Sequence, residues 1–297
     1  MNGCMLCPRQ CQIKREEGKR GFCGESDLVR LSRAALHMWE EPCISGTNGS
    51  GAVFFSGCTL RCVYCQNYHI ANSEVGKTVS VERLSEIFLE LQEQGANNIN
   101  LVTPGQYVPH IIRAVEQARR QGLAVPIVYN TGSYENVDTI KALEGIVDIY
   151  LPDFKYLDPE HAKKYSGAED YPEVAKAALE EMVRQTGNPV FNDVGIMTKG
   201  VIVRHLLLPG CLRDARRIVK YLYETYGDQI YMSLMNQYTP LDTLNREKYP
   251  ELAKKVTKKA YDVLVDYAID LGVEQAFIQE GETAKESFIP DFSYEGV

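Results

Sequence analysis

Three cysteines in one short segment are the residues of this chain best suited to chemistry. Cys58, Cys62 and Cys65 follow the spacing C-x3-C-x2-C, and Tyr64 directly precedes the last of them. Three thiolates suit a cubane of four irons and four sulfides and leave one iron without a protein ligand, whereas a cluster that only stores electrons normally takes four cysteines. The motif therefore predicts an iron–sulfur cluster whose open iron can bind a substrate or a cofactor.

Two simpler interpretations of the motif stay open. The three cysteines could be part of a ferredoxin-type or zinc site with a remote fourth ligand, for which Cys43 and Cys211 are the candidates. The motif could also arise by chance in a chain with nine cysteines. The open cluster is favoured because residues 51–57, just before the motif, have the pattern of a short buried strand that ends in a glycine turn.

A second group of cysteines lies near the N-terminus. Cys4, Cys7, Cys11 and Cys23 supply four thiolates, which is a complete set of ligands for one metal centre. In a reducing compartment such clusters indicate metal ligation rather than disulfides. A structural zinc ion and a second iron–sulfur cluster that relays electrons both fit these ligands. The spacing does not decide between them, and we lean towards a structural metal because a relay needs a partner.

Composition limits the class of protein further. The chain has 297 residues, of which 44% are hydrophobic, and a formal net charge of -8. No long basic run is present, so tight binding of nucleic acid through its phosphates is not expected. The N-terminus lacks an apolar signal segment, and the longest apolar stretch, residues 201–208, is too short to span a bilayer. We therefore expect a cytoplasmic protein without a membrane or nucleic-acid partner.

From residue 51 onward the chain alternates between strand and helix patterns, which is typical of a parallel sheet with crossover helices. We expect residues 1–50 to form a Cys-rich metal-binding extension and a connector, and residues 51–297 to form one α/β domain. About seven strands predict a partial (β/α) barrel, similar to but shorter than a TIM barrel. Strands are expected near 51–57, 99–102, 127–129, 146–151, 201–208, 230–234 and 277–279, and helices near 81–95, 108–121, 172–186, 213–226 and 248–270.

The polar residues that could form a site follow directly on these strands. Cys58, Thr103, Asn130, Asp153 and Lys155 each come just after a predicted strand. In α/β sheets and barrels, ligands bind at the carboxyl ends of the strands. The positions of these residues directly after the strands therefore predict a single site at the barrel mouth.

Taken together, these motifs resemble the radical S-adenosylmethionine superfamily, and more closely the pyruvate formate-lyase activating enzymes and a largely unassigned activase-like branch. The resemblance covers residues 51–280 and depends on the three loop cysteines and on residues 130–132, 153–155 and 203–210. It implies a [4Fe–4S] cluster that binds S-adenosylmethionine at the open iron and cleaves it to a 5′-deoxyadenosyl radical, which abstracts hydrogen. It also implies an external one-electron donor of the flavodoxin or ferredoxin type.

The resemblance also implies which side chains surround S-adenosylmethionine. Asp153, Lys155 and Arg204 match positions that contact it in the activases, and carboxylate and cationic groups suit its zwitterionic methionine moiety. Tyr64 is expected beside the adenine. The activases carry Gly-Gly-Glu after their second strand, and the carboxylate receives the methionine amino group. This chain has no carboxylate in residues 102–105.

Three neutral side chains complete the expected cofactor site. Thr103 stands in the segment that lacks the carboxylate, and its hydroxyl would have to serve together with backbone carbonyls. Asn130 replaces an aspartate of the activases, and Gln237 lines up roughly with a late histidine. These changes in polarity put the activase substrate in doubt more than the cofactor.

Several of these residues also have a purely structural interpretation. Asp153 and Lys155 could be an ordinary ion pair at a strand end, and Asn130 could cap a turn. Arg204 lies in an apolar strand, where an unpaired charge is costly, so it is expected to have a partner. His205 alternates to the opposite face and is expected to be structural. Cys43 and Cys211 are expected to be structural free thiols.

Three functions remain as hypotheses. The first is hydrogen abstraction from a protein or peptide, such as the glycine of a partner enzyme, and the second is radical chemistry on a small-molecule metabolite. The third is a non-catalytic metal-binding interaction module. A protein substrate is favoured because a short barrel with few insertions leaves room for a partner loop. Residues 187–200 are expected to border that opening, and either the partner loop or the Cys4–Cys23 segment is expected to act as a lid.

Overall fold

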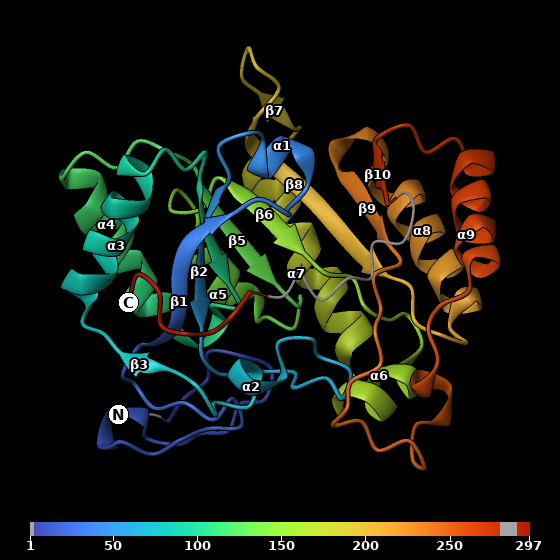
Figure 1. Ribbon diagram of the computed structural model, residues 1–297, viewed down its shortest axis with the longest axis horizontal. Coiled ribbons are helices and arrows are strands. Elements are labelled where there is room, and N and C mark those ends of the chain that lie inside the picture. Colours follow the sequence, from blue (N-terminus) through green and yellow to red (C-terminus); the bar gives the residue numbers. More distant parts are fainter. Residues whose placement is uncertain (1–2, 280–289) are drawn as a thin grey trace.

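The computed structural model describes residues 3–279 and 290–297 and contains one mixed sheet with helices around it (Figure 1). Three of its strands, at residues 50–55, 99–102 and 149–152, are short and buried along their whole length, as expected of strands covered on both faces. The strands are β1 (Arg30–His37), β2 (Ser50–Phe55), β3 (Lys77–Thr78), β4 (Ile99–Val102), β5 (Ile127–Thr131), β6 (Ile149–Pro152), β7 (Val190–Phe191), β8 (Met197–Leu206), β9 (Tyr231–Met235) and β10 (Ala276–Ile278).

The sheet confirms the predicted α/β partial barrel. Its strand order is β10-β9-β8-β6-β5-β4-β2-β1-β3, with β7 paired to β8 alone. Within the described part of the chain, the seven strands β2, β4, β5, β6, β8, β9 and β10 run parallel to one another. Because β10 and β3 stand at opposite ends of this order, the sheet does not close into a full barrel.

Helices connect the parallel strands and cover the outer face of the sheet (Figure 1). Helix α3 begins where expected, because the Ser80 hydroxyl accepts a hydrogen bond from the Arg83 N–H at 3.1 Å. The helices are α1 (Pro42–Ser45), α2 (Tyr68–Ala71), α3 (Val81–Glu93), α4 (Val108–Arg120), α5 (Val137–Lys141), α6 (Pro159–Ser166), α7 (Tyr171–Thr186), α8 (Leu212–Tyr226) and α9 (Lys258–Leu271), with short 3-10 turns at Arg15–Glu17, Gly105–Tyr107, Gly227–Gln229 and Pro250–Ala253.

The connector and the last helix differ from the sequence-based expectation. The expected connector contains strand β1, which pairs antiparallel with β2 and so adds an edge to the barrel sheet. The last helix begins at Lys258 rather than near residue 248, because the Thr257 hydroxyl caps it by accepting from the Ala260 N–H at 3.2 Å. Periodicity marked the last helix but not its start, which depends on this cap.

The two ends of the barrel are built from different parts of the chain. Helix α1 packs at the amino ends of the strands, where its residues Cys43 and Ile44 share a buried cluster with Val128, Ile149 and Ile202. The β7 hairpin lies at this same end in Figure 1, and residues 191 and 194–196 line a surface hollow beside α1. The expectation that residues 187–200 border the site opening is wrong, since this segment contains β7 and the amino end of β8 and none of it lines the cavity at the other end of the strands.

The C-terminal segment is part of the same body. The backbone N–H of Ala34 donates to the Glu295 carbonyl at 2.8 Å, and that of Tyr294 donates to the Ser32 carbonyl at 3.1 Å. Phe292 packs edge-on against Phe54 of β2, with ring centroids 5.5 Å apart. Within residues 3–279 and 290–297, no helix combines the length and the apolar character that crossing a bilayer needs.

Candidate active site at the carboxyl ends of the strands

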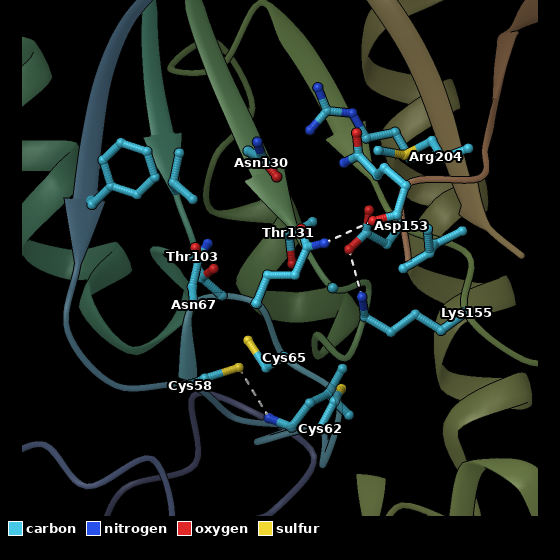
Figure 2. Close-up of a pocket in the computed structure, with 18 of the residues that line it drawn as sticks. Cys58, Cys62, Cys65, Asn67, Thr103, Asn130, Thr131, Asp153, Lys155 and Arg204 are labelled. Atoms are coloured by element: carbon cyan, nitrogen blue, oxygen red, sulfur yellow. Dashed lines mark hydrogen bonds and ion pairs between the residues drawn. The ribbon is translucent and has the colours of Figure 1, made fainter. Parts of the chain in front are cut away.

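A cavity of about 240 Å³ lies at the carboxyl ends of the parallel strands (Figure 2). Its walls come from the loop after β2, from the ends of β4, β5, β6 and β8, and from the segment after β9. The fold thus brings together side chains that are far apart in the sequence. The thiols Cys58, Cys62 and Cys65 line the cavity with every side chain expected around the cofactor, namely Tyr64, Thr103, Asn130, Asp153, Lys155, Arg204 and Gln237.

The loop after β2 presents three thiols to this cavity. The Leu60 N–H donates to Cys58 Sγ at 3.4 Å, and the Ser166 hydroxyl donates to Cys62 Sγ at 3.0 Å. Such donors stabilise negative charge on sulfur. Burial raises the pKa of the Cys58 and Cys65 thiols, so iron must displace their protons. Nowhere in the described chain do three Cys, His, Asp or Glu side chains already form a site for a single metal ion. The shared cavity and the donors to sulfur fit a three-thiolate cluster.

An ion pair follows strand β6 on the cavity wall. Lys155 Nζ lies 2.6 Å from Asp153 Oδ2. The Tyr171 hydroxyl holds their backbone by donating to the Asp153 carbonyl and accepting from the Lys155 N–H. Burial opposes the charge on Lys155, but Asp153 raises the pKa of its ammonium, so Lys155 stays charged. A side chain at Gly132 would lie 2.9 Å from Leu60 Cδ1, so glycine lets the cysteine loop approach the pair.

Arg204 is paired with two carboxylates that the sequence did not place in the site. Its Nε donates to Glu41 Oε1 at 2.8 Å, and its Nη2 contacts both Glu41 and Glu40. The Asn100 amide donates to Glu40 Oε1 at 2.8 Å. Burial opposes the charge on Glu41, yet Arg204 holds the pKa of that carboxyl below its usual value. Glu40 lines the cavity, so it brings a carboxylate to a site whose strand ends lack the one the activases use.

Two neutral side chains come from the ends of β4 and β5. Thr103 has a positive φ of 36°, and its carbonyl accepts from the Gln106 amide at 3.0 Å. Asn130 faces the cavity (Figure 2). The turn that follows it is held by Thr131, whose hydroxyl accepts from the Ser133 N–H at 3.2 Å. Turn capping therefore belongs to Thr131, which leaves the Asn130 amide directed at the cavity.

Tyr64 and Gln237 lie on other parts of the wall. Tyr64 is buried, and its hydroxyl accepts a hydrogen bond from the Tyr156 hydroxyl at 2.7 Å. Its ring, rather than its hydroxyl, is the part left to contact a ligand. The Gln237 carbonyl accepts from the Gln66 amide at 2.9 Å, and its side-chain oxygen accepts from Gln279 at 2.8 Å. These bonds connect the cysteine loop to the segment after β9.

Other singled-out residues lie outside the cavity. His205 is buried, and its Nδ1 is 2.8 Å from the Phe154 carbonyl, while its structural role stays a prediction. Cys43 is buried at the opposite end of the barrel. Cys211 is partly buried just before α8, with its Sγ 3.8 Å from the Pro209 carbonyl. Neither cysteine lines the cavity, so neither is placed as a fourth ligand to the loop cluster.

Glu135 is a buried carboxyl that sequence reasoning missed. It accepts hydrogen bonds from the Thr131 hydroxyl at 2.6 Å and the Tyr129 hydroxyl at 3.3 Å. Burial raises its pKa to about 7, although these hydrogen bonds act to lower it. A side chain at Gly105 would lie 2.7 Å from the Glu135 carboxylate, so the glycine makes room for it. No sequence pattern pointed to Glu135, because its burial depends on the approach of two loops.

Comparison with known proteins agrees with this geometry. Residues 52–209, more than half of the chain, match the radical SAM superfamily. The uncharacterized protein MJ0674 of Methanocaldococcus jannaschii is 26% identical over 279 residues, which cover 90% of this chain and 76% of that protein. The pyruvate formate-lyase-activating enzyme of Clostridium pasteurianum is 25% identical over 237 residues, which cover 71% of this chain and 91% of the enzyme.

A solved structure shares the fold. Streptococcus suis SuiB bound to S-adenosylmethionine is 14% identical with a TM-score of 0.52, covering 79% of this chain and 51% of SuiB. SuiB bound to its precursor peptide SuiA is 15% identical with a TM-score of 0.50, covering 75% of this chain and 46% of SuiB. The chain thus spans about half the length of SuiB. It belongs to the radical SAM superfamily, whose members use a [4Fe–4S] cluster and S-adenosylmethionine.

Proposed function

We propose that this protein is a radical SAM enzyme that abstracts hydrogen from a protein or peptide substrate. The observation that carries the proposal is one cavity in which the thiols of Cys58, Cys62 and Cys65 lie with the Asp153–Lys155 ion pair. When bound, the cluster and S-adenosylmethionine supply a 5′-deoxyadenosyl radical by one-electron cleavage of the sulfonium C–S bond. The protein holds these groups in place and excludes water.

The cavity residues have complementary roles in this proposal. The three loop thiols are the iron ligands. Lys155 and Asp153 suit the carboxylate and ammonium groups of the methionine moiety, and Glu40 adds a further acceptor for the ammonium group. Further side chains complete the cofactor wall: Thr103, Asn130, Arg204 and Gln237 orient polar groups, and the ring of Tyr64 lies beside the adenine.

Two likenesses support a protein or peptide substrate. One relative is named as a pyruvate formate-lyase-activating enzyme, and this chain matches 91% of its length. A protein with a similar fold, SuiB, has been solved with its precursor peptide. We place the reaction in the cytoplasm, where thiols stay reduced, with a flavodoxin- or ferredoxin-type protein as electron donor. Radical chemistry on a small metabolite is the alternative outcome of the test.

The reaction class is tested with anaerobically reconstituted protein, dithionite and S-adenosylmethionine. The parent should release 5′-deoxyadenosine, whereas Cys62→Ala should lose it because a ligand of the cluster is missing. Cys211→Ala is the matched control, since this thiol lies outside the cavity. Release of 5′-deoxyadenosine by Cys62→Ala at the parent rate would contradict the proposal.

The substrate class needs a separate experiment with deuterium. Proteins from cells grown on deuterated amino acids are incubated with the reconstituted enzyme, and the 5′-deoxyadenosine is analysed by mass spectrometry. Deuterium transfer from the protein fraction supports a protein substrate, and a glycyl radical signal in that fraction would identify the activase form. Transfer only from a deuterated small-molecule fraction would replace the protein substrate with a metabolite and leave the radical chemistry intact.

A further inference from the structure

We infer that Cys4, Cys7, Cys11 and Cys23 bind one metal centre through four thiolates, and that this centre holds the Cys58–Cys65 loop in position. The second part rests on the proposed function, because it takes the loop to carry the radical cluster. The chemical class is a soft metal, either one zinc ion or an iron–sulfur cluster, since both use four thiolates.

The first observation is that the four cysteines share one cavity. All of them line one small cavity. Two backbone hydrogen bonds bring Cys4 beside the Cys11 turn: the Cys4 N–H donates to the Ile13 carbonyl at 2.8 Å, and the Gln12 N–H donates to the Cys4 carbonyl at 3.1 Å. A turn from Cys7 to Gln10 then directs Cys7 to the same place. Local backbone structure thus brings the four thiols around one cavity, where binding of a metal would draw them together.

Glycine keeps the centre of this arrangement clear. A β-carbon at Gly21 would lie 3.0 Å from Cys11 Sγ and 3.7 Å from Cys23 Sγ. The sulfurs of Cys11 and Cys23 are therefore close to one point, and any side chain at Gly21 would intrude on them. The next turn, in which the Gly24 N–H donates to the Gly21 carbonyl at 2.9 Å, sets the position of Cys23.

The second observation is the charge around the thiols. Arg9 and Arg15 both line the cavity, and the hydrogen bonds found for their guanidinium groups go to backbone carbonyls. Neither forms an ion pair within residues 3–279 and 290–297, and Arg15 is only 5% exposed. A buried charge without a counter-charge is costly. Four thiolates on a divalent centre carry a net negative charge, which these two cations would balance.

The third observation is direct contact between this segment and the cluster loop. The Cys58 N–H donates to the Cys23 carbonyl at 3.3 Å, so a ligand of one site bonds to a ligand of the other through the backbone. Arg9 Nε donates to the Thr59 carbonyl at 2.9 Å. Thr59 also lines the four-thiol cavity. The segment packs behind the loop and does not line the active-site cavity, so the expectation that it is a lid is wrong.

Two further pairs of hydrogen bonds connect the N-terminal segment to the cluster loop. Arg9 Nη2 donates to the Ser166 carbonyl at 2.9 Å, and the Ser166 hydroxyl donates to Cys62 Sγ at 3.0 Å. Arg15 Nη1 donates to the Gln106 carbonyl at 2.5 Å, while the Gln106 amide donates to the Gly57 carbonyl at 3.1 Å. Arg15 is thus connected to the start of the cluster loop, and Arg9 is connected to its middle. Metal binding that orders the N-terminal segment would order the loop through them.

The existence of the centre is tested in the full chain carrying Cys58→Ala, Cys62→Ala and Cys65→Ala, reconstituted anaerobically with iron, sulfide and zinc. Elemental analysis should find about one zinc or about four irons per chain, and either result supports the site. Adding Cys7→Ala and Cys11→Ala should remove this metal, whereas adding Cys43→Ala and Cys211→Ala as the matched control should not. Absence of metal in the first variant would overturn the site.

The supporting role is tested with the loop cysteines intact. Arg9→Ala keeps all four N-terminal thiols but removes the bonds to Thr59 and Ser166. We expect it to retain the N-terminal metal and to lose loop-cluster iron to a chelator about tenfold faster than the parent, the effect of one charge-assisted hydrogen bond. Arg120→Ala, at an exposed end of α4, is the control.

The visible absorbance of the cluster measures the loss of iron. Equal rates of loss in Arg9→Ala and the parent would overturn the supporting role. Failure of the proposed function is distinguishable from this result. A chain that holds the N-terminal metal and a stable loop cluster but never cleaves S-adenosylmethionine would refute the function and leave the metal site in place.

Discussion

The guanidinium of Arg204 lies between two carboxylates from a distant part of the chain. Glu40 and Glu41 precede α1, more than 160 residues before Arg204, and all three side chains are largely buried. Buried ion pairs are poor evidence of stability, because desolvation offsets most of the attraction. Their value here is position, since only Glu40 of the two carboxylates reaches the active-site cavity.

This difference between neighbouring carboxylates leads to the first prediction. Glu40→Gln should weaken binding of S-adenosylmethionine to the reconstituted enzyme about tenfold or more, because a charge-assisted acceptor for the ammonium group is lost. Glu41→Gln, the matched control, should change the affinity much less, since Glu41 does not line the cavity. Anaerobic calorimetry measures both affinities, and equal losses in the two variants would contradict the assignment.

Glu135 gives a prediction about pH. Its carboxyl has an unfolded pKa near 4.5 and a folded pKa of about 7, so the folded state holds its proton more tightly. Stability is therefore lost as the pH rises from about 4.5 through about 7, and the full cost of about 3 kcal/mol applies above that range. Glu135→Gln removes this cost.

We expect the free energy of unfolding of Glu135→Gln, relative to the parent, to increase between pH 5 and pH 8 by up to about 3 kcal/mol. Denaturant titrations at both pH values measure it. Glu247→Gln, at an exposed carboxyl, is the control and should show no such trend. A relative stability that stays constant or falls with pH would show that Glu135 is ionised at no cost in the folded protein.

At the scale of elements, the two ends of the parallel strands have different roles. The loops after β2, β4, β5 and β6 carry the site residues, while α1 and the β7 hairpin occupy the amino ends of the strands. Whether a connecting segment contributes to the site therefore depends on which end of the strands it lies at. Residues 187–200 include exposed apolar side chains, with Val194 80% exposed, yet they stand at the end away from the thiols.

We predict that shortening this hairpin leaves catalysis intact. Deletion of residues 192–195, with the turn rebuilt as Asn-Gly, should keep both the affinity for S-adenosylmethionine and the rate of 5′-deoxyadenosine release within about twofold of the parent, because no contact with the cavity changes. A large loss of either quantity, in a variant with parent-like iron content, would show that the hairpin acts on the site.

At the scale of the whole molecule, the site joins segments from nearly the full length of the chain. Residues from the β1–α1 connection, the cysteine loop, the strand ends and Pro290 all line one cavity. The division between an extension up to residue 50 and a barrel from residue 51 stays a prediction, although β1 and Glu40 tie the two parts together. A ligand in this cavity should therefore stabilise the whole fold.

Thermal unfolding tests this linkage. With S-adenosylmethionine at about one hundred times its Kd, the cluster-loaded parent should unfold about 5 °C higher than without it, since the bound state gains about 2.7 kcal/mol. Cys62→Ala should show little of this shift, because the open iron is absent. An equal rise in Cys62→Ala would show that the ligand binds without the cluster.

Short-range patterns in the sequence were enough to predict several features of the structure. The spacing of Cys58, Cys62 and Cys65, the Ser80 cap and the alternation of buried strands with amphipathic helices predicted the cluster loop, the start of α3 and the open α/β barrel. These features depend on residues a few positions apart, where backbone geometry alone relates one side chain to the next. The placement of polar residues after strands followed from the same reasoning.

Other features were decided only by the tertiary structure. The pairing of Arg204 with Glu40, the contact of Cys23 with Cys58 and the burial of Glu135 join segments whose separation in sequence carries no periodic signal. Strand β1 was hidden in the connector because its pairing with β2, rather than its own pattern, makes it a strand. Long-range contacts are selected by packing and by the need to pair buried charge, and both require the whole fold.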